Sequence, residues 1–562
     1  MSTFGIDLGT TYSCIAKLDR NGNPEVIRNQ EDASDTLASA VFFETPDNVI
    51  IGNSAKDMLE TDGDRVVQFV KREIGKSTGI TREYFGKTYT PVEISALILK
   101  RLKQIAEDQG ESVTDVVITC PAYFGLEEKN ATAKAGELAG MNVLDIINEP
   151  TAAALSYCAR QFQEERTILV YDLGGGTFDV TIVKMSMVTN GDGNEVQKIK
   201  VVATGGNDLL GGKDWDDRLF NYIIQACCDE NGLEQSEIDA EARQQIRSKI
   251  EPTKKKLSNA ENAKVKVNIN GTLTTVQISR EEFENLTSDL VAQTMNYVEK
   301  TLKDAGDIEI DMVLLVGGST YMPMIRNAVE DKFPGKVQLH EPDRAVAMGA
   351  AIYANMLVHV DPLPDPEFSD PGPVPPIGPD DTNNPGENGP DGPEKPNQGS
   401  NITNNGPTIE IVDQTPRSFG PGVLNEAGEY IIDNIIKRGE PMPATFVKTY
   451  YTAADNMEKI VLRAFESMCT DDTLTPCVNN FGEEQATDPS HNVKLLGDLE
   501  LMLPPNTKKR SPIEVTFEVS GTGVYVKALN LSTGDDVHTT LHMQSDIDAA
   551  ASAVNTIQVS AE

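Results

Sequence analysis

The chain has 562 residues, enough for about two to four domains, and its 39% hydrophobic and 24% charged residues are typical of folded proteins. Acidic residues outnumber basic residues 87 to 49, and the net charge of −38 disfavours binding to nucleic acid or to an anionic membrane surface. No apolar stretch is long enough to span a membrane, and no signal peptide is visible. The seven scattered cysteines favour a reducing cytoplasm, although Cys469 and Cys477 could pair within one loop.

The first 360 residues alternate between short apolar runs and helical patterns. The runs at 116–119, 168–171 and 312–316 are typical of buried strands in a sheet. Between them, Thr90-Pro91-Val92-Glu93 predicts a capping box at the start of a helix, and apolar residues follow at helical spacing as far as Ile105. This alternation predicts an α/β fold for residues 1–360.

One short pattern occurs twice, at Ile6–Tyr12 and at Tyr171–Phe178. In both copies an apolar run ends in an aspartate, Asp7 or Asp172, and a Gly/Thr turn follows. Glycine lets the backbone approach a phosphate closely, hydroxyl groups add donors, and a strand-end aspartate can hold Mg²⁺ through water. A single copy would be only an Asp-Gly turn, but two copies predict duplicated halves that face one nucleotide cleft.

Three further segments fit such a cleft, and each also has an ordinary structural interpretation. Glu149 precedes an alanine-rich helix and is placed to orient water or metal, or is simply a helix-start glutamate. The segment Val316–Thr320 would let a base or ribose lie against its glycines, or is a plain turn between a strand and a helix. Residues Lys254–Lys256 are an adenosine contact or a solvated helix face.

The composition changes after residue 360. Residues 361–400 contain 12 prolines, 6 glycines, nine acidic residues and one lysine, which predicts a disordered, extended acidic linker over 361–407. Residues 408–545 carry strand patterns, including 513–519 and 524–527 on either side of a turn at 520–523, and predict an all-β domain. Residues 546–562 are predicted to be a short tail, with a short helix or no regular structure.

Six segments of the first 360 residues occur in an order typical of one family: Ile6–Ser13, Pro121–Phe124, Asn148–Leu155, Asp172–Val180, Gly211–Gly212 and Gly317–Pro323. In this order they resemble the 70-kDa heat-shock chaperones, which belong to the actin-like ATPase superfamily, and the resemblance extends over almost all of residues 1–360. Less closely, 413–416, 436–438, 495–497 and 513–519 resemble the β-sandwich substrate-binding subdomain of the same family.

The resemblance implies an ATPase that converts ATP to ADP and phosphate with Mg²⁺, and it adds K⁺ as a candidate ion. By the same resemblance, Lys71 reaches the γ-phosphate, Glu149 lies near the attacking water, Asp172 and Thr177 complete the catalytic set, and Asp7 and Asp172 organise hydrated Mg²⁺. The implied nucleotide contacts are Gly9, Thr10, Thr11, Tyr12, Gly175, Gly176, Glu251, Lys254, Lys255, Ser258, Gly318, Ser319, Tyr321 and Asp343.

In the β-domain the resemblance places Tyr450, Ile460 and Leu462 in a pocket for extended apolar peptides, with ordinary sandwich core as the alternative. The implied protein is a monomeric, cytoplasmic, ATP-dependent chaperone in which ATP hydrolysis modulates peptide binding. A J-domain co-chaperone and a nucleotide-exchange factor are candidate partners. The alternative function is a nucleotide-gated switch or scaffold for one dedicated protein partner.

Several departures from the family pattern carry expectations of their own. Tyr321 replaces an arginine that stacks on adenine, Lys129 replaces a second arginine, and Asp145 reverses the charge of a third that helps bind the J-domain. Between Lys71 and Pro121 the chain is shorter than in the family, which predicts that one small subdomain is trimmed. The helical lid is predicted to be absent, and an acidic insertion lies at 470–492.

The last departure concerns the segment that joins the two domains. In the family a short apolar segment docks on the ATPase domain, and here its counterpart is Ile409–Val412. Glu410 adds a charge to this segment, which costs free energy on docking unless the charge is paired. Together with the long linker, this charge predicts a rarely docked segment and weak coupling between peptide binding and ATP hydrolysis.

Overall fold

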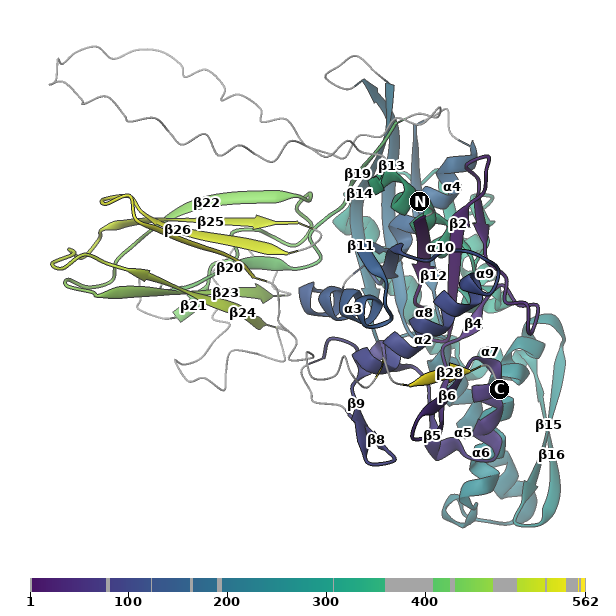
Figure 1. The fold of residues 1–562 in the computed structure, drawn as a ribbon. Coiled ribbons are helices and arrows are strands. Elements are labelled where there is room, and N and C mark those ends of the chain that lie inside the picture. Colours follow the sequence, from purple (N-terminus) through teal and green to yellow (C-terminus); the bar gives the residue numbers. More distant parts are fainter. Residues whose placement is uncertain are drawn as a thin grey trace, which may run out of the picture.

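A computed structural model of the chain describes residues 3–76, 81–122, 124–161, 165–189, 195–306, 308–358, 408–424, 430–467, 493–520, 523–541, 554 and 557–560. An α/β domain of two lobes lies beside a β-sandwich, on the right and left of Figure 1. The predicted linker 361–407, the insertion 470–492, and Cys469 and Cys477 lie outside the described residues. The other five cysteines are buried and free.

The first lobe is built around a mixed sheet with the strand order β11-β10-β1-β2-β3, and β4 pairs with β2. Strands β1 and β10 are parallel neighbours with buried side chains, as their apolar sequences predict. The strands are β1 (Thr3–Asp7), β2 (Tyr12–Leu18), β3 (Pro24–Val26), β4 (Leu37–Ala38), β10 (Asp115–Cys120) and β11 (Asn142–Asn148).

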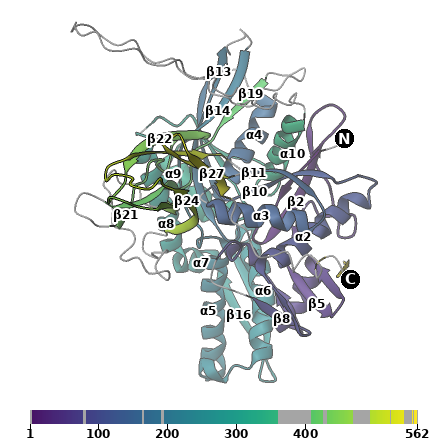
Figure 2. The same cartoon turned by 60° about the vertical axis from the view of Figure 1, so that its left-hand side comes forward.

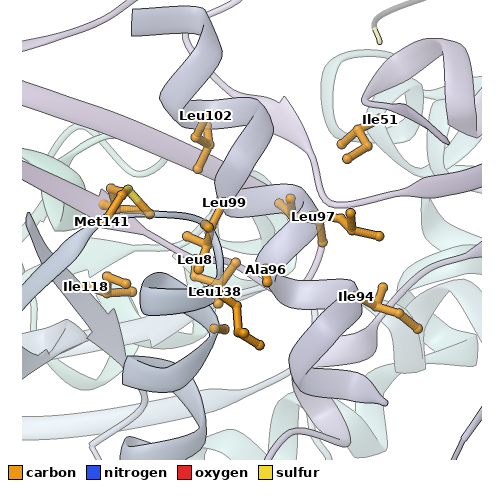
Figure 3. Packing of buried hydrophobic residues seen from close by; sticks show 14 of the residues in the cluster. Leu8, Ile51, Ile94, Ala96, Leu97, Leu99, Leu102, Ile118, Leu138 and Met141 are labelled. Atoms are coloured by element: carbon orange, nitrogen blue, oxygen red, sulfur yellow. The ribbon is translucent and has the colours of Figure 1, made fainter. Parts of the chain in front are cut away.

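Two helices cover this sheet, α2 (Pro91–Glu107) and α3 (Leu126–Leu138). The predicted capping box of α2 is confirmed, since the Thr90 hydroxyl accepts from the Glu93 backbone N–H and the Glu93 carboxylate accepts from that of Thr90. Figure 3 shows the apolar face of α2, with Leu97, Leu99 and Leu102 packed among side chains of the neighbouring elements. The buried face follows from the helical spacing of its apolar residues.

A small four-stranded sheet extends this lobe, with the order β28-β6-β5-β7, and a hairpin of β8 and β9 lies next to it. Its last member comes from the far end of the chain. The sequence predicts a short helix or no regular structure beyond residue 545, but residues 558–560 form a strand. Three residues are too few for their alternation to reveal a strand in advance. The elements of this region are β5 (Val41–Thr45), β6 (Asn48–Ile51), α1 (Asn53–Asp57), η1 (Met58–Glu60), η2 (Gly63–Arg65), β7 (Val66–Val67), η3 (Val70–Arg72), β8 (Arg82–Tyr84), β9 (Lys87–Tyr89) and β28 (Gln558–Ser560).

The second lobe is built around a sheet with the order β18-β17-β12-β13-β14-β19. Its strands β12 and β13 repeat the antiparallel pair β1 and β2 of the first lobe, so the duplication seen in the sequence is a duplication of structure. The strands are β12 (Arg166–Leu173), β13 (Phe178–Thr189), β14 (Glu195–Asn207), β17 (Met312–Val316), β18 (Val337–Leu339) and β19 (Thr408–Val412), with a separate hairpin of β15 (Asn262–Ile269) and β16 (Thr272–Ser279).

The helices of the second lobe are α5 (Gly212–Asn231), η4 (Gln235–Glu237), α6 (Ala240–Asn259), α7 (Arg280–Leu286), α8 (Ser288–Asp304), η5 (Gly318–Tyr321) and α9 (Pro323–Lys332). Helices α4 (Glu149–Gln161) and α10 (Ala345–Val358) join the two lobes. Their small and apolar residues share one buried cluster with strands of both sheets, including Val117, Ala152, Leu314 and Ala350. This shared core holds the two lobes around a cleft.

Strand β19 corrects one expectation from the sequence. It adds to the edge of the second-lobe sheet, where Thr408 pairs with Val196 and Val412 with Lys200 in parallel register. Glu410 does not oppose this docking, because its carboxylate pairs with Lys198 Nζ at 2.8 Å. In this structure the segment is docked, contrary to the expectation, and one of the two obstacles behind that expectation is removed because the Glu410 charge is paired.

The β-sandwich consists of two four-stranded sheets, β21-β20-β23-β24 and β22-β25-β26-β27, around one apolar core. The predicted hairpin joins β25 and β26. In Figure 2 the sandwich lies against the α/β domain near α3, where Lys494 Nζ bonds to Glu127 Oε2 at 2.6 Å and Glu128 Oε1 at 3.2 Å. The strands are β20 (Ser418–Leu424), β21 (Tyr430–Ile432), β22 (Ala444–Tyr451), β23 (Lys459–Ser467), β24 (Lys494–Met502), β25 (Pro512–Val519), β26 (Val524–Asn530) and β27 (Asp536–Leu541).

Candidate active site

The two repeated Gly/Thr turns meet at one cavity of about 750 Å³ between the lobes. Every predicted nucleotide, metal and catalytic residue except Gly176 lines this cavity, although these residues come from segments spread over the first 343 positions of the chain. They are Asp7, Gly9, Thr10, Thr11, Tyr12, Lys71, Glu149, Asp172, Gly175, Thr177, Glu251, Lys254, Lys255, Ser258, Gly318, Ser319, Tyr321 and Asp343.

Glycine is required where the two turns touch. A methyl group on Gly175 would lie 1.8 Å from Thr11 Oγ1, and one on Gly176 would lie 2.6 Å from Thr10 Oγ1. Any larger residue would therefore push the turns apart. Arg72 holds the second turn from the side, since its Nε donates to the Gly176 carbonyl at 2.8 Å. The result is a cradle of backbone amides and hydroxyls of the kind that binds phosphate.

The floor of the cleft carries an excess of negative charge. Asp7 ends β1, Asp172 lies near the end of β12, and Glu149 begins α4, and Lys71 forms a buried ion pair with Glu149. Burial raises the pKa of Asp172, and the charges of Glu149 and Asp7 raise it further. Burial disfavours the Lys71 ammonium, but Glu149 and Asp7 nevertheless raise the pKa of Lys71 above its ordinary value. One lysine thus faces several crowded carboxylates, a donor set that suits a hard cation.

Asp179 is a further buried carboxylate that the sequence interpretation did not single out. It lies opposite Asp172 in the pairing of β12 with β13. Its Oδ1 accepts from the Ala122 backbone N–H at 3.1 Å, and its Oδ2 has no hydrogen-bond partner among the residues that the structure describes. Burial, followed by the charge of Glu149, raises its pKa well above the ordinary value. Its position two residues after Thr177 was the signal available in the sequence.

Tyr12 and α6 form a polar cluster at another part of the cavity. The Tyr12 hydroxyl donates to Glu251 Oε1 at 2.8 Å, and Lys255 Nζ donates to the Tyr12 oxygen at 2.9 Å. Lys56 forms an ion pair with Glu251 across the two lobes. Together with Lys255, it draws the pKa of Glu251 down to about 2 despite the opposing effect of burial. This cluster bridges the first and second lobes above the phosphate cradle.

The three lysines of α6 have different surroundings. Lys254 is buried and donates to the Gly212 carbonyl at 2.9 Å, and it pairs with Asp216 at 2.8 Å. Lys255 faces the cavity, whereas Lys256 is exposed and does not line it. Lys254 and Lys255 are therefore placed to contact adenosine, whereas Lys256 lies on a solvated helix face.

The segment after β17 forms a third side of the cavity. Ser319 Oγ donates to the Gly174 carbonyl at 2.9 Å, which ties this segment to the second Gly/Thr turn. Tyr321 is 43% exposed, and its hydroxyl bonds to Asp343. Burial and the Asp343 charge raise the pKa of Tyr321 to about 12, so the phenol is neutral at physiological pH. An exposed aromatic ring at this position has a free face for stacking.

The residues predicted to form the peptide pocket lie together in the sandwich but differ in exposure. Leu462 is buried in the apolar core, so sandwich core is the better interpretation for this residue. Ile460 and Tyr450 are partly buried and pack against that core. The Tyr450 hydroxyl donates to Asp433 Oδ2 at 2.8 Å, and Lys448 pairs with the same oxygen at 2.5 Å. Ile460 and Tyr450 therefore retain surface that another molecule can reach.

Comparison with known proteins decides the family. The family described as Hsp70 protein matches residues 3–370 of this chain. The chain belongs to the Hsp70 family. It is 35% identical over 548 residues to the chaperone protein DnaK of Thermosipho melanesiensis, and the aligned region covers 95% of this chain and 78% of that protein.

Membership of the Hsp70 family answers the main functional question raised by the sequence. The protein is an ATP-dependent molecular chaperone and an ATPase, as predicted, and no finding favours the alternative of a dedicated switch. Proteins of the Hsp70 family bind ATP and ADP with Mg²⁺. Among the described residues, no helix combines the length and the apolar character needed to cross a membrane.

Proposed function

We propose that the 750 Å³ cavity between the lobes binds ATP and Mg²⁺ and is where water cleaves ATP to ADP and phosphate, with the residues listed above in the roles that the resemblance implies. The observation that carries this proposal is the meeting of the two Gly/Thr turns over Asp7, Asp172, Glu149 and Lys71. Backbone amides and hydroxyls there suit phosphate oxygens, and adenosine fits between α6 and Tyr321.

The donor set also fits a magnesium ion. No group of three or more His, Cys, Asp or Glu side chains among the described residues forms a ready metal cage. Mg²⁺ commonly keeps several waters and takes one or two carboxylates together with substrate phosphates. Asp7 and Asp172 supply two such carboxylates. Burial, followed by the charge of Glu149, raises the pKa of both, and a bound cation would stabilise their ionised forms. K⁺ is a secondary candidate for the remaining negative charge.

In this proposal the protein residues act mainly by position and charge. Lys71 places an ammonium beside the transferring phosphoryl group and stabilises its developing charge. Glu149, whose carboxylate bonds to Lys71, orients the attacking water and can accept its proton. Thr177 and the neighbouring glycines hold the phosphate chain so that attack occurs in line.

We further propose that the β-sandwich binds extended apolar peptides at the surface formed by Tyr450 and Ile460. The inner side chains of β22 support this proposal, because they remain reachable although their strand partners are buried. Phe446 is 38% exposed, whereas Phe517 opposite it on β25 is fully buried. A peptide at this surface would gain apolar contacts together with backbone hydrogen bonds.

We propose partners and a location for the protein as well. Substrate peptides, a J-domain co-chaperone and a nucleotide-exchange factor are proposed partners of a monomeric protein, and the five buried free thiols suit a reducing cytoplasm. Asp145 stands at the position of the charge reversal, and both of its carboxylate oxygens accept hydrogen bonds from this chain. Its Oδ2 accepts from the Tyr353 hydroxyl at 2.8 Å and its Oδ1 from the Ile146 N–H at 2.7 Å. We expect a J-domain partner to rely on other residues.

The proposed peptide site can be tested with two neighbouring residues of β23. Ile460 lies opposite the buried Leu501 and faces inward, whereas Val461 lies opposite Glu500 and is 40% exposed on the outer face. Fluorescently labelled apolar heptapeptides should bind wild type and Val461→Asp, and should bind Ile460→Asp at least tenfold more weakly, because a buried charge is costly. ATP should accelerate peptide release from the wild type. Equal binding by Ile460→Asp, with its fold intact by circular dichroism, would contradict the site.

A further inference from the structure

The C-terminal end of the chain returns to the first lobe of the ATPase domain. Strand β28 runs parallel to β6, with Gln558 opposite Asn48 and Ser560 opposite Ile50, and the Gln558 backbone N–H donates to the Asp47 carbonyl at 2.9 Å. Figure 1 shows this yellow strand beside the purple strand β6, far from the sandwich strands of similar colour. The two paired segments lie more than 500 residues apart in sequence.

Apolar side chains anchor this end. Val554, Ile557 and Val559 are 0%, 2% and 7% exposed and belong to the core cluster of the first lobe, whereas Gln558 is exposed. Alternating buried and exposed residues are typical of a strand that covers a core. We call Val554 and residues 557–560 the C-terminal clasp.

Polar contacts hold the clasp from two sides. Lys100 of α2 reaches its backbone, because Nζ donates to the Ile557 carbonyl at 2.9 Å and to the Val554 carbonyl at 3.2 Å. Asn48 of β6 donates from Nδ2 to Ser560 Oγ at 3.1 Å. The clasp is therefore held by polar contacts to its backbone and to Ser560 in addition to the burial of its apolar side chains.

The clasp occupies the edge of a small sheet of the first lobe. It lies in the small sheet β28-β6-β5-β7, next to the segment between Lys71 and Pro121 that the sequence predicts to be trimmed. Without the clasp, β6 would be an edge strand with unpaired backbone groups and uncovered apolar residues. Neither defect is present in the full chain, because β28 supplies the missing strand.

We propose that the edge of β6, together with Lys100, is a strand-binding site whose occupant is the C-terminal clasp of the same chain. The sandwich is entered from β19 on the second lobe and is followed by β28 on the first lobe, so it is connected to both lobes of the nucleotide cleft. The clasp is thus a second point, besides β19, at which the chain that carries the sandwich joins the ATPase domain.

Hydrogen exchange of the full chain tests this site. Val559→Asp should speed amide exchange in residues 48–51 and 557–560 by at least tenfold, because a charge cannot remain in the apolar cluster. Gln558→Asp makes the same change at the exposed neighbour and should leave exchange near the wild-type rate. Lys100→Met should speed exchange at 557–560. Wild-type protection in Val559→Asp would overturn the proposal.

A complementation experiment separates binding from general stability. A chain that ends at residue 553 should lose protection at β6, and a synthetic peptide of residues 552–562 should restore it saturably, whereas the same peptide with Val559→Asp should not. Fluorescence of Trp215, the single tryptophan, buried in α5 of the second lobe, reports whether the shortened chain is folded. If the shortened chain does not fold, hydrogen exchange of full-length Val559→Asp and Gln558→Asp tests the proposal instead. Failure of the wild-type peptide with a folded chain, or protection that requires a dimer, would overturn an intramolecular clasp.

Discussion

Lys198 of β14 and Glu410 of β19 form an ion pair at 2.8 Å, where the segment between the two domains joins the second lobe. The two side chains are 24% and 14% exposed, so the pair is largely shielded from solvent. The charge that the sequence suggests would hinder docking therefore has a partner on the docking surface. Because the joining segment is docked, we expect peptide binding and ATP hydrolysis to be more strongly coupled than the sequence predicts.

A charge-swap series tests this pair. Glu410→Lys would place a lysine against Lys198 and should release β19, with peptide stimulation of ATP hydrolysis falling toward none. The double variant Lys198→Glu with Glu410→Lys should recover most of it, since the swapped pair keeps its attraction. Steady-state ATPase assays with saturating peptide measure both. No difference between Glu410→Lys and wild type would show that coupling does not pass through this strand.

Removal of Lys71 should affect catalysis much more than binding. Lys71→Ala should slow single-turnover ATP hydrolysis by about 10²–10³-fold, because the variant lacks the cation beside the transferring phosphate. Nucleotide binding should survive. Lys76→Ala is the matched control, since Lys76 lies in the same stretch but pairs with Asp208 at 3.9 Å outside the nucleotide cavity. Hydrolysis at the wild-type rate in Lys71→Ala would contradict the proposed role.

The replacement of an arginine by Tyr321 predicts a stacking contact with adenine. Tyr321→Ala should weaken ADP binding by about 1–3 kcal/mol, the usual range for a base stacked on an aromatic ring. Tyr321→Phe should bind ADP nearly as well as wild type, because it loses the bond to Asp343 but keeps the ring. Calorimetric titration of the three proteins distinguishes these cases, and equal affinity for Tyr321→Ala would rule out stacking.

Docking of the sandwich should depend on pH through Asp413, which follows β19. Its Oδ2 accepts from Asn148 Nδ2 at 2.6 Å. Burial raises the Asp413 pKa above 3.8, Asp145 adds to the rise, and Lys129 opposes it. A raised pKa in the docked state means that docking is favoured by protonation, so it should strengthen as the pH falls and weaken as the pH rises through the raised value.

Small-angle scattering along a titration from neutral pH down to the ordinary pKa of aspartate measures this effect as a change in the radius of gyration. The wild type should become more compact toward the acidic end. Asp413→Asn, which cannot ionise, should show a flatter profile. Asp145 has a raised pKa as well, so Asp145→Asn serves as the companion variant that apportions the response. A wild-type profile unchanged by both substitutions would exclude this mechanism.

Much of the candidate site could be predicted from sequence because its parts are contiguous motifs. A strand that ends in aspartate and turns through Gly and Thr specifies its own backbone shape, and two copies indicate a shared cleft. The capping box at Thr90 and the hairpin at 520–523 were predictable for the same reason, since the residues that stabilise them are close neighbours in sequence.

The α/β and all-β character of the two parts of the chain and the two Gly/Thr turns could thus be predicted from local sequence patterns, and the family resemblance supplied most other residues around the cavity. The partners of the charged groups became visible once the chain was folded: Glu410 pairs with Lys198, and Asp179 lies beside the crowded carboxylates. The tertiary structure also decided that Leu462 belongs to the core and that the end of the chain completes a sheet at β6. Burial, electrostatic pairing and parallel strand pairing depend on which segments the fold brings together, and for Glu410 and for β28 the partner segments lie hundreds of positions away in the sequence.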